Sequence, residues 1–244
     1  MSDTSFVITN QLLGMSLELA EKDLLPHLQE VCLTSGQVLC EPGTKMTDVY
    51  FPQNARLSLL AVMSDRTTIE VNSVGREGFV GLSAILGSNA IDTRLVVQIS
   101  GKALKLPGDI LKQEFKQQKD LQQLFLLYIQ TRLNQISQIA VCHSHHEIKQ
   151  RLASWILPIY DNTQQNTLFL TQKYISSMLG VRRASITETA ISFQKQGIIK
   201  YNRGQITLLD RSKLEAVACE CYSKIASEYQ SLFKTKLSQN SSRK

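Results

Sequence analysis

The chain has 244 residues, of which 43% are hydrophobic and 20% charged, a balance typical of a folded globular protein rather than a disordered one. Its longest apolar run, residues 124–129, is far shorter than the roughly 20 residues of a membrane-spanning helix. A secretory signal begins with basic residues, whereas the first basic residue of this chain is Lys22. Five cysteines in a chain of this size exclude a disulfide framework, so we expect a cytoplasmic protein with reduced thiols and no membrane partner.

The net charge of +6 is unevenly distributed. Residues 1–142 contain 12 Lys and Arg against 14 Asp and Glu, whereas residues 143–244 contain 15 against 7. The second part therefore carries a net charge of +8 and the first part −2. This asymmetry favours a polyanionic partner for the second part, with a merely solubilising basic face as the alternative.

Glycine marks a change of structure along the chain. Eight of the 12 glycines lie between Gly36 and Gly108, and none lies in residues 109–179. Because glycine is frequent in turns and scarce inside helices, the first region is predicted to be strands and turns and the second to be helical. After a short amphipathic helix over residues 10–25, the strand-length segments predict a small antiparallel sandwich or barrel. These segments are 36–40, 49–51, 57–63, 67–74 and 95–99.

The segment 109–141 has the pattern of a long helix that is apolar on two sides. A helix against a β-barrel needs one apolar face, so the second face requires another partner. The simplest partner is the same helix of a second subunit, and a central helix buried within a monomer is the alternative. The stripes are Phe125, Ile129, Leu133, Ile136 and Ala140 on one side and Leu121, Leu124, Tyr128 and Thr131 on the other. The predicted dimer helix residues are Leu121, Leu124, Phe125, Tyr128, Ile129, Leu133 and Ile136.

Residues 142–146 interrupt this pattern and predict a hinge. A further amphipathic helix over 147–159 is expected to end near Pro158, before a polar loop over 161–166. Two nearby groups offer metal ligands: the Cys219–Cys221 pair, which can bind metal or respond to oxidation, and the histidines His143, His145 and His146. We favour packed thiols and a polar hinge, and predict no metal site.

The most specific motif begins at Thr171, which is a plausible N-cap for a helix over 172–178. A break at residues 179–181, with Gly180 available for a left-handed conformation, precedes a second helix over 182–196. Two short helices joined by a glycine turn, with cationic residues opening the second, are typical of a helix-turn-helix. The buried positions of the second helix are predicted to be Ile186, Ala190 and Phe193.

The N-terminal residues of such a second helix read base edges, where Arg can bind guanine and Glu can accept from cytosine. Residues 197–209 are predicted to form a β-hairpin wing whose Lys200 and Arg203 contact phosphates. A solvated helix start is the alternative for two adjacent arginines. The candidate DNA-binding residues are Thr171, Lys173, Arg182, Arg183, Ser185, Thr187, Glu188, Lys200 and Arg203.

Together these segments resemble the family of the cyclic AMP receptor protein and the fumarate–nitrate reduction regulator (Crp/Fnr), bacterial transcription factors. The resemblance covers nearly the whole chain and is strongest over 170–209, above all over 178–183. It implies an α+β fold: an N-terminal antiparallel β-roll over 1–108, a dimerisation helix and hinge over 109–142, and a winged helix-turn-helix over 143–244. It also implies a homodimer on a two-fold-related site in double-stranded DNA, with RNA polymerase as a partner if the protein is an activator.

The sequence departs from the family pattern in the sensor region. Cyclic-nucleotide members carry Phe-Gly-Glu-Leu followed by Arg-Ser/Thr, where Glu binds the ribose and Arg the phosphate. Here residues 79–83 read Phe-Val-Gly-Leu-Ser, and Asp92 stands where the phosphate-binding arginine belongs. We therefore expect no ordinary cyclic AMP binding, no bound cofactor and an unidentified effector. The candidate pocket residues are Gly81, Leu82, Ser83, Thr93 and Arg94.

Other departures from the family pattern concern the DNA site and the group that the sensor could bind. The second helix has Arg183-Ala184 and then Glu188, so the DNA site of the cyclic AMP receptor protein does not transfer to this chain. Iron–sulfur and haem sensing are disfavoured, because the β-roll half holds only Cys32, Cys40 and His27 as such ligands.

No phosphate loop, His-Glu-x-x-His or nucleophile elbow occurs, so we expect no enzyme and no catalytic residue. The predicted function is a DNA-binding transcription regulator; the alternative is a small-molecule-binding signalling module that acts through a protein partner.

Overall fold

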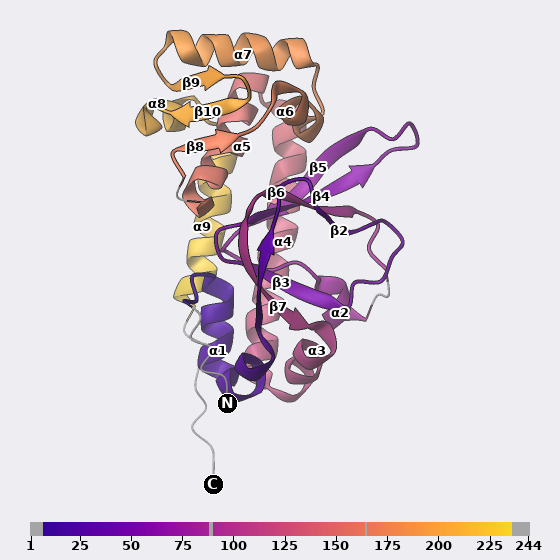
Figure 1. Cartoon of the computed structure of the whole chain (residues 1–244). Helices are drawn as coiled ribbons and strands as arrows, with labels where there is room; N and C mark the ends of the chain where they lie inside the picture. The colour runs from indigo at the N-terminus through magenta and orange to yellow at the C-terminus, as the bar shows by residue number, and fades with distance from the viewer. Residues whose placement is uncertain (1–6, 88–89, 164, 236–244) are drawn as a thin grey trace.

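The computed structural model describes residues 7–87, 90–163 and 165–235. It places an N-terminal β-roll beside a long helix, α4 (Lys119–His145), and a winged helix-turn-helix at the far end of that helix (Figure 1). The last helix of the described residues, α9 (Glu220–Lys234), runs back alongside α4. Among the described residues, no helix combines the length and apolarity needed to cross a membrane.

Two antiparallel sheets form the β-roll and enclose an apolar core that includes Leu57, Leu95 and Val97. This confirms the sandwich predicted from strand and glycine spacing. Two of its strands were not predicted, β1 (Gln29–Leu33) and β7 (Gly101–Pro107); β1 is mostly exposed and lacks the alternation of a half-buried strand. The first sheet has the order β1 (Gln29–Leu33), β7 (Gly101–Pro107), β3 (Asp48–Pro52), and the second β2 (Val38–Cys40), β6 (Arg94–Ile99), β4 (Arg56–Val62), β5 (Thr68–Val74).

The helix predicted over residues 10–25 is present as α1 (Gln11–Leu24), and it closes one side of the β-roll. It begins at Asn10, whose side-chain oxygen accepts a 2.9 Å hydrogen bond from the Leu13 amide. The Asn10 side-chain nitrogen donates to the carbonyls of Pro52 and Gly78 at 2.9 and 2.7 Å. One side chain thus caps the helix and joins it to the β-roll.

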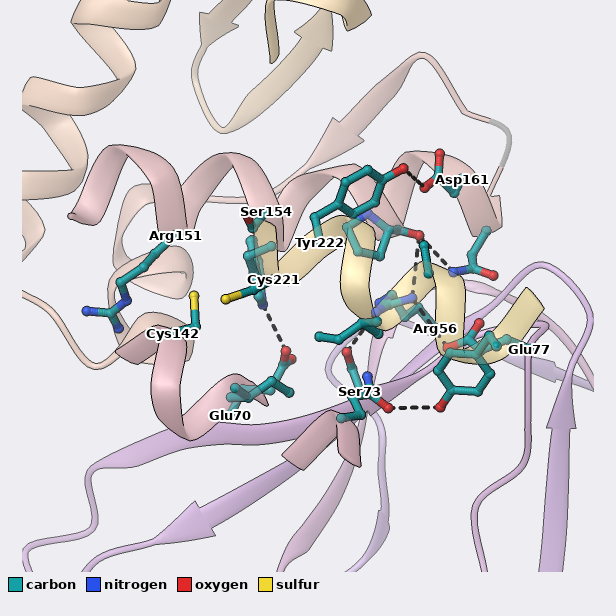
Figure 2. Close-up of a pocket in the computed structure, with 18 of the residues that line it drawn as sticks. Arg56, Glu70, Ser73, Glu77, Cys142, Arg151, Ser154, Asp161, Cys221 and Tyr222 are labelled. Atoms are coloured by element: carbon teal, nitrogen blue, oxygen red, sulfur yellow. Dashed lines mark hydrogen bonds and ion pairs between the residues drawn. The ribbon is translucent and has the colours of Figure 1, made fainter. Parts of the chain in front are cut away.

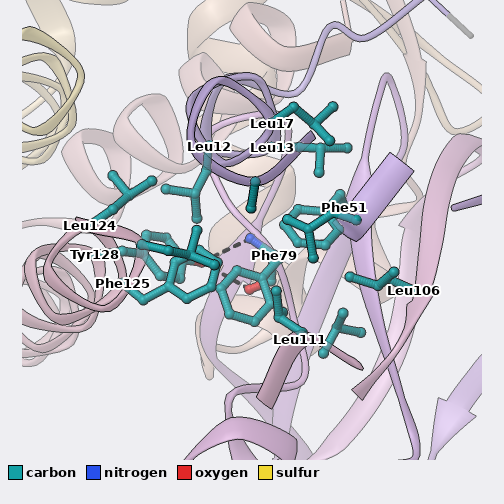
Figure 3. Packing of buried hydrophobic residues seen from close by; sticks show 14 of the residues in the cluster. Leu12, Leu13, Leu17, Phe51, Phe79, Leu106, Leu111, Leu124, Phe125 and Tyr128 are labelled. Atoms are coloured by element: carbon teal, nitrogen blue, oxygen red, sulfur yellow. Dashed lines mark hydrogen bonds between the residues drawn. The ribbon is translucent and has the colours of Figure 1, made fainter. Parts of the chain in front are cut away.

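The largest core lies between α1, the first sheet and α4 (Figure 3). At its centre Phe79 packs against Phe51, Phe125 and Tyr128, with ring centroids 5.1 to 5.5 Å apart. The buried Tyr128 hydroxyl donates to the Phe79 carbonyl at 2.9 Å and accepts from the Phe79 amide at 3.0 Å. Gly78 is required at this contact, because a Cβ atom there would overlap the Tyr128 side chain. The sensor and the long helix therefore share one core.

The long helical segment differs from the prediction at both ends. A break at Gln118, whose backbone is extended, separates α3 (Gly108–Gln117) from α4. The Gln118 side chain donates to the carboxylates of Glu114 and Asp23, contacts that hydropathy does not report. At the other end α4 continues to His145, so the predicted hinge over 142–146 is helical except for its last residue. No Gly or Pro occurs within α4 to end it earlier.

The C-terminal part also contains one helix longer than expected. Helix α5 (Ile148–Thr163) passes through Pro158 and includes the first residues of the predicted loop 161–166. Its buried apolar side chains, including Ile156 and Ile159, hold the helix together although Pro158 lacks an amide donor. The remaining elements are β8 (Thr167–Phe169), α6 (Gln172–Leu179), α7 (Arg183–Lys195), β9 (Ile199–Asn202), β10 (Gln205–Leu208) and α8 (Arg211–Val217), with the sheet order β8-β10-β9.

Candidate DNA-binding surface and sensor pocket

Helices α6 and α7 form the predicted helix-turn-helix. Thr171 caps α6 by accepting a 3.1 Å hydrogen bond from the Tyr174 amide, and Gly180 ends α6 in the left-handed conformation with φ 63°. Arg182 has an extended backbone and occupies the N-cap position of α7. As predicted, Ile186, Ala190 and Phe193 are the buried side of α7. In Figure 1 α7 lies along the edge of the molecule farthest from the β-roll.

The candidate residues on α7 have two different environments. Arg182, Arg183 and Glu188 are exposed at or near the N-terminal end of the helix and are free to meet base edges. Thr187 is half-buried, and its hydroxyl donates a 2.8 Å hydrogen bond to the Gln172 side chain. Ser185 is also half-buried. Thr187 thus fixes α7 against α6, a contact that the sequence pattern did not indicate.

The wing follows the prediction and is attached to the start of α6. Arg203 and Gly204 turn the chain between β9 and β10 with φ values of 46° and 84°, as in the tight turns of β-hairpins. The Leu170 amide donates to the Gly204 carbonyl at 2.7 Å, and the Tyr201 hydroxyl donates to the Leu170 carbonyl at 2.7 Å. Lys173, Lys200 and Arg203 are exposed, as is the capping residue Thr171.

The candidate pocket residues of the β-roll lie on α2 (Leu82–Leu86) and at the start of β6. Gly81 precedes α2 with φ 112°, and a Cβ atom there would lie 2.7 Å from the Val49 side chain, so only glycine fits. The Ser83 hydroxyl is buried and makes no hydrogen bond to the described residues. The Arg94 guanidinium pairs with the Glu41 carboxylate at 2.8 Å, and Asp92 is exposed.

The two apolar stripes of α4 have different partners. Leu121, Leu124, Phe125 and Tyr128 are fully buried within the chain, so the prediction that these four contact a second subunit is wrong. Phe125 in particular faces the core and does not continue the stripe of Ile129. An exposed stripe remains on the other side, where Leu126, Leu133 and Ile136 are 48%, 55% and 45% exposed. The stripe comprises Leu126, Ile129, Leu133, Ile136 and Ala140, at spacings of 3, 4, 3 and 4 residues.

A cavity of about 300 Å³ lies at the boundary of the β-roll and the helix-turn-helix domain, among β4, β5, α4, α5 and α9 (Figure 2). The buried Glu70 carboxylate accepts hydrogen bonds from Trp155 Nε1 at 2.8 Å and Gln98 Nε2 at 2.9 Å. Burial raises the pKa of Glu70, against the opposing effects of Ser58 and Arg56. Arg56 donates to the Ser73 hydroxyl at 2.8 Å.

These contacts connect the two parts of the molecule. The Trp155 indole belongs to α5, whereas Glu70 belongs to β5 of the β-roll. Close to them, Met178 of α6 is buried against Leu60 and Val96, and a Cβ atom on Gly180 would lie 3.2 Å from the Ile69 side chain. The β4–β5 hairpin therefore contacts the helix-turn-helix directly. Sequence reasoning missed these residues because their partners are distant along the chain, from 85 positions for Glu70 and Trp155 to 118 for Leu60 and Met178.

A β-roll joined by a long helix to a winged helix-turn-helix is the architecture of a sensor-linked, DNA-binding transcription regulator. Comparison with protein-family models gives the same class: residues 30–118 match the cyclic nucleotide-binding domain, and residues 150–217 match the Crp-like helix-turn-helix domain. The chain belongs to the Crp/Fnr family of transcription regulators. No curated protein sequence matches it.

Solved structures of this class share the fold. A protein from Eubacterium rectale, assigned to the Crp/Fnr family, aligns with a TM-score of 0.65 at 20% identity over 81% of this chain and 93% of its own. FixK2 from Bradyrhizobium japonicum gives a TM-score of 0.65 at 13% identity over 79% and 98%. The cyclic di-GMP-responsive regulator CLP from Xanthomonas campestris gives 0.60 at 15% identity over 78% and 98%.

Proposed function

We propose that this regulator is a homodimer that binds a specific, two-fold-related DNA sequence and does so without ordinary cyclic AMP binding. The observation that carries the proposal is the combination of two exposed features on one chain. One is the apolar stripe from Leu126 to Ala140 on α4, and the other is the cationic N-terminal end of α7. The first provides a symmetric contact and the second a reader of base edges.

The stripe has the geometry of a helix–helix contact. Alternating spacings of 3 and 4 residues place its side chains on one seam of α4, as in a two-stranded coiled coil. Leu126, Leu133 and Ile136 leave about half of their surfaces uncovered, and a second copy of α4 would bury them. Each partner would then present one α7 to DNA, and half-sites about one helical turn, roughly 34–36 Å, apart are the geometry that such dimers read.

The sensor region supports the expectation about the effector. A cyclic phosphate needs a cationic partner, and the candidate Arg94 already pairs with Glu41. Asp92 adds a negative charge two residues before it, and no carboxylate follows Gly81 where the family binds ribose. Cyclic AMP would therefore meet a site that repels its phosphate and lacks the ribose acceptor. We propose no cofactor in the pocket of the β-roll, and RNA polymerase as a partner where the protein activates.

The test is a selection of bound duplexes from a random DNA pool, followed by fluorescence anisotropy with the selected duplex, with and without cyclic AMP. Expected is a two-fold-related sequence bound equally well in both conditions, and lost in the double variant Arg182→Ala/Arg183→Ala. Lys116→Ala, an exposed cation on α3, is the matched control and keeps full binding. Binding that requires cyclic AMP overturns the effector proposal. Failure to enrich any sequence overturns the DNA proposal and favours the protein-partner alternative.

A further inference from the structure

Four metal-binding side chains converge where α4 ends and α9 begins. They are Cys142, His146, Cys219 and Cys221, and their ligand atoms all lie within 4.8 Å of one another. The Cys142 and Cys219 sulfur atoms are 3.5 Å apart, and Cys221 Sγ is 3.5 Å from His146 Nδ1. All three cysteines are buried, and only 9% of the His146 side chain is exposed. Figure 2 shows Cys142 and Cys221 facing the same space beside Arg151.

This arrangement has the size of a tetrahedral metal site. For three sulfur ligands and one nitrogen ligand, zinc bonds of about 2.3 Å to sulfur and 2.0 Å to nitrogen give tetrahedron edges of about 3.8 Å between sulfurs and about 3.5 Å between sulfur and nitrogen. The 3.5 Å between Cys221 Sγ and His146 Nδ1 matches the sulfur–nitrogen edge, and the 3.5 Å between the Cys142 and Cys219 sulfurs is slightly shorter than the sulfur–sulfur edge. Three cysteines and one histidine are also a frequent ligand set of structural zinc sites. We propose that Cys142, His146, Cys219 and Cys221 bind one Zn²⁺ ion in a closed structural site.

The surrounding residues are those that a zinc site requires. His146 Nε2 lies 3.2 Å from the Glu220 carboxylate, which leaves Nδ1 facing the thiols as a ligand. Gln138 Nε2 donates to Cys221 Sγ at 3.0 Å, a contact that suits a thiolate.

Ser154 adds a second donor. Its hydroxyl oxygen accepts from the Cys219 amide at 3.0 Å, and its proton can be donated to Cys219 Sγ at 3.0 Å, a shorter contact than the 3.5 Å to the Cys219 carbonyl. Arg151, which interacts electrostatically with Cys142 and Cys219, offsets the single negative charge of a zinc ion with three thiolates. Neutral thiols that merely fill space would need none of these donors.

The position of the site indicates its role. Cys142 lies in the last turn of α4, His146 in the link to α5, and Cys219 and Cys221 at the start of α9. One ion would thus tie the end of α4 and the link to α5 to the start of α9, at the junction between the sensor helix and the helix-turn-helix. The inference is independent of DNA binding and of the dimer, since every ligand comes from one chain.

The experiment measures metal in the purified full-length protein, first by mass spectrometry and then by Co²⁺ substitution after chelation. We expect about one zinc per chain, and a thiolate-to-cobalt charge-transfer band of tetrahedral Co²⁺. Cys219→Ser and His146→Asn should each lower zinc affinity at least about tenfold. The matched controls are Cys32→Ser, an exposed cysteine of β1, and His145→Asn, the exposed neighbour of His146, which keep one zinc.

Two results would overturn the proposal. One is a protein without zinc after growth in zinc-supplemented medium and without a cobalt charge-transfer band. The other is a Cys142–Cys219 disulfide, detected as a loss of two hydrogens in non-reduced peptide mapping of freshly purified protein. The cobalt spectrum is recorded on the natural protein, so this test of the metal site does not depend on whether a variant folds.

Discussion

Trp155 of the helix-turn-helix domain donates a 2.8 Å hydrogen bond to the buried carboxylate of Glu70 in the β-roll. This bond crosses the boundary between sensor and DNA-binding parts, and it is formed by the hairpin β4–β5 that also contacts α6. A change in the packing of that hairpin would therefore act on the position of α7 through a rigid, satisfied contact.

The raised pKa of Glu70 makes stability depend on pH. Because the pKa is higher in the folded chain than its ordinary value of 4.5, the folded state binds the proton more tightly, and stability falls as pH rises above the unfolded pKa. We expect Glu70→Gln to lose this dependence. Urea unfolding of both proteins at several pH values between 4 and 8 gives the free energy of unfolding. As the pH rises, this free energy should fall for the natural protein relative to the variant. A difference that is constant with pH would contradict this account.

The exposed stripe of α4 predicts the effect of charged substitutions. Leu133→Glu combined with Ile136→Glu should give a folded monomer in sedimentation at micromolar concentration, because both side chains are about half exposed in the single chain. DNA affinity should fall together with dimerisation. Leu86→Glu, an equally exposed apolar residue on α2, is the control and should remain dimeric. A dimeric double variant would place the interface elsewhere.

The exposed cations of α7 and the wing should differ in what they contribute. Arg183→Ala should cost about 1–3 kcal/mol on the selected duplex and little on a scrambled one, as expected for a residue that reads a base. Lys200→Ala should weaken binding to both duplexes similarly and lower the salt dependence, as a phosphate contact would. Anisotropy titrations on both duplexes at several salt concentrations separate the two behaviours. Equal losses for Arg183→Ala on both duplexes would make it a phosphate contact.

The Glu220 carboxylate, which contacts the proposed ligand His146, should strengthen zinc binding. Glu220→Gln should weaken zinc binding about 10- to 100-fold, because it removes the charged partner of the ligand His146. Competition with a chromogenic chelator gives the affinity. Glu215→Gln, an exposed carboxylate that pairs with Arg211, is the control and should leave the affinity unchanged. An unchanged affinity in Glu220→Gln would show that the 3.2 Å contact does not orient the histidine.

Local signals predicted the helix-turn-helix well. Thr171 caps α6 and Gly180 ends it through contacts within a few residues, so both ends of this helix can be predicted from the local sequence. The wing was predicted for the same reason, since Arg203 and Gly204 make its turn alone. The β-roll was predicted from its spacing, although the exposed strand β1 was not.

The misplaced features depend on distant partners. The sequence pattern left the face of α4 with Phe125 and Tyr128 available to a second subunit. In the structure, α1 and Phe79 of the same chain cover that face. Cys142 and Cys219 are 77 positions apart, so spacing along the chain did not reveal that they meet. Pro158 did not end α5, because burial of the surrounding side chains outweighs one missing hydrogen bond.

The return of α9 along α4 places Tyr229 and Leu232 in the same core as Leu12 and Leu13 of α1. Helix α9 is therefore needed to complete the core that α1 begins. During synthesis, the β-roll can pair its strands early, but its final packing must wait until α9 has been made. A fragment that stops after α4 would expose this surface and is expected to aggregate, so the sensor is best prepared with its C-terminal helix in place.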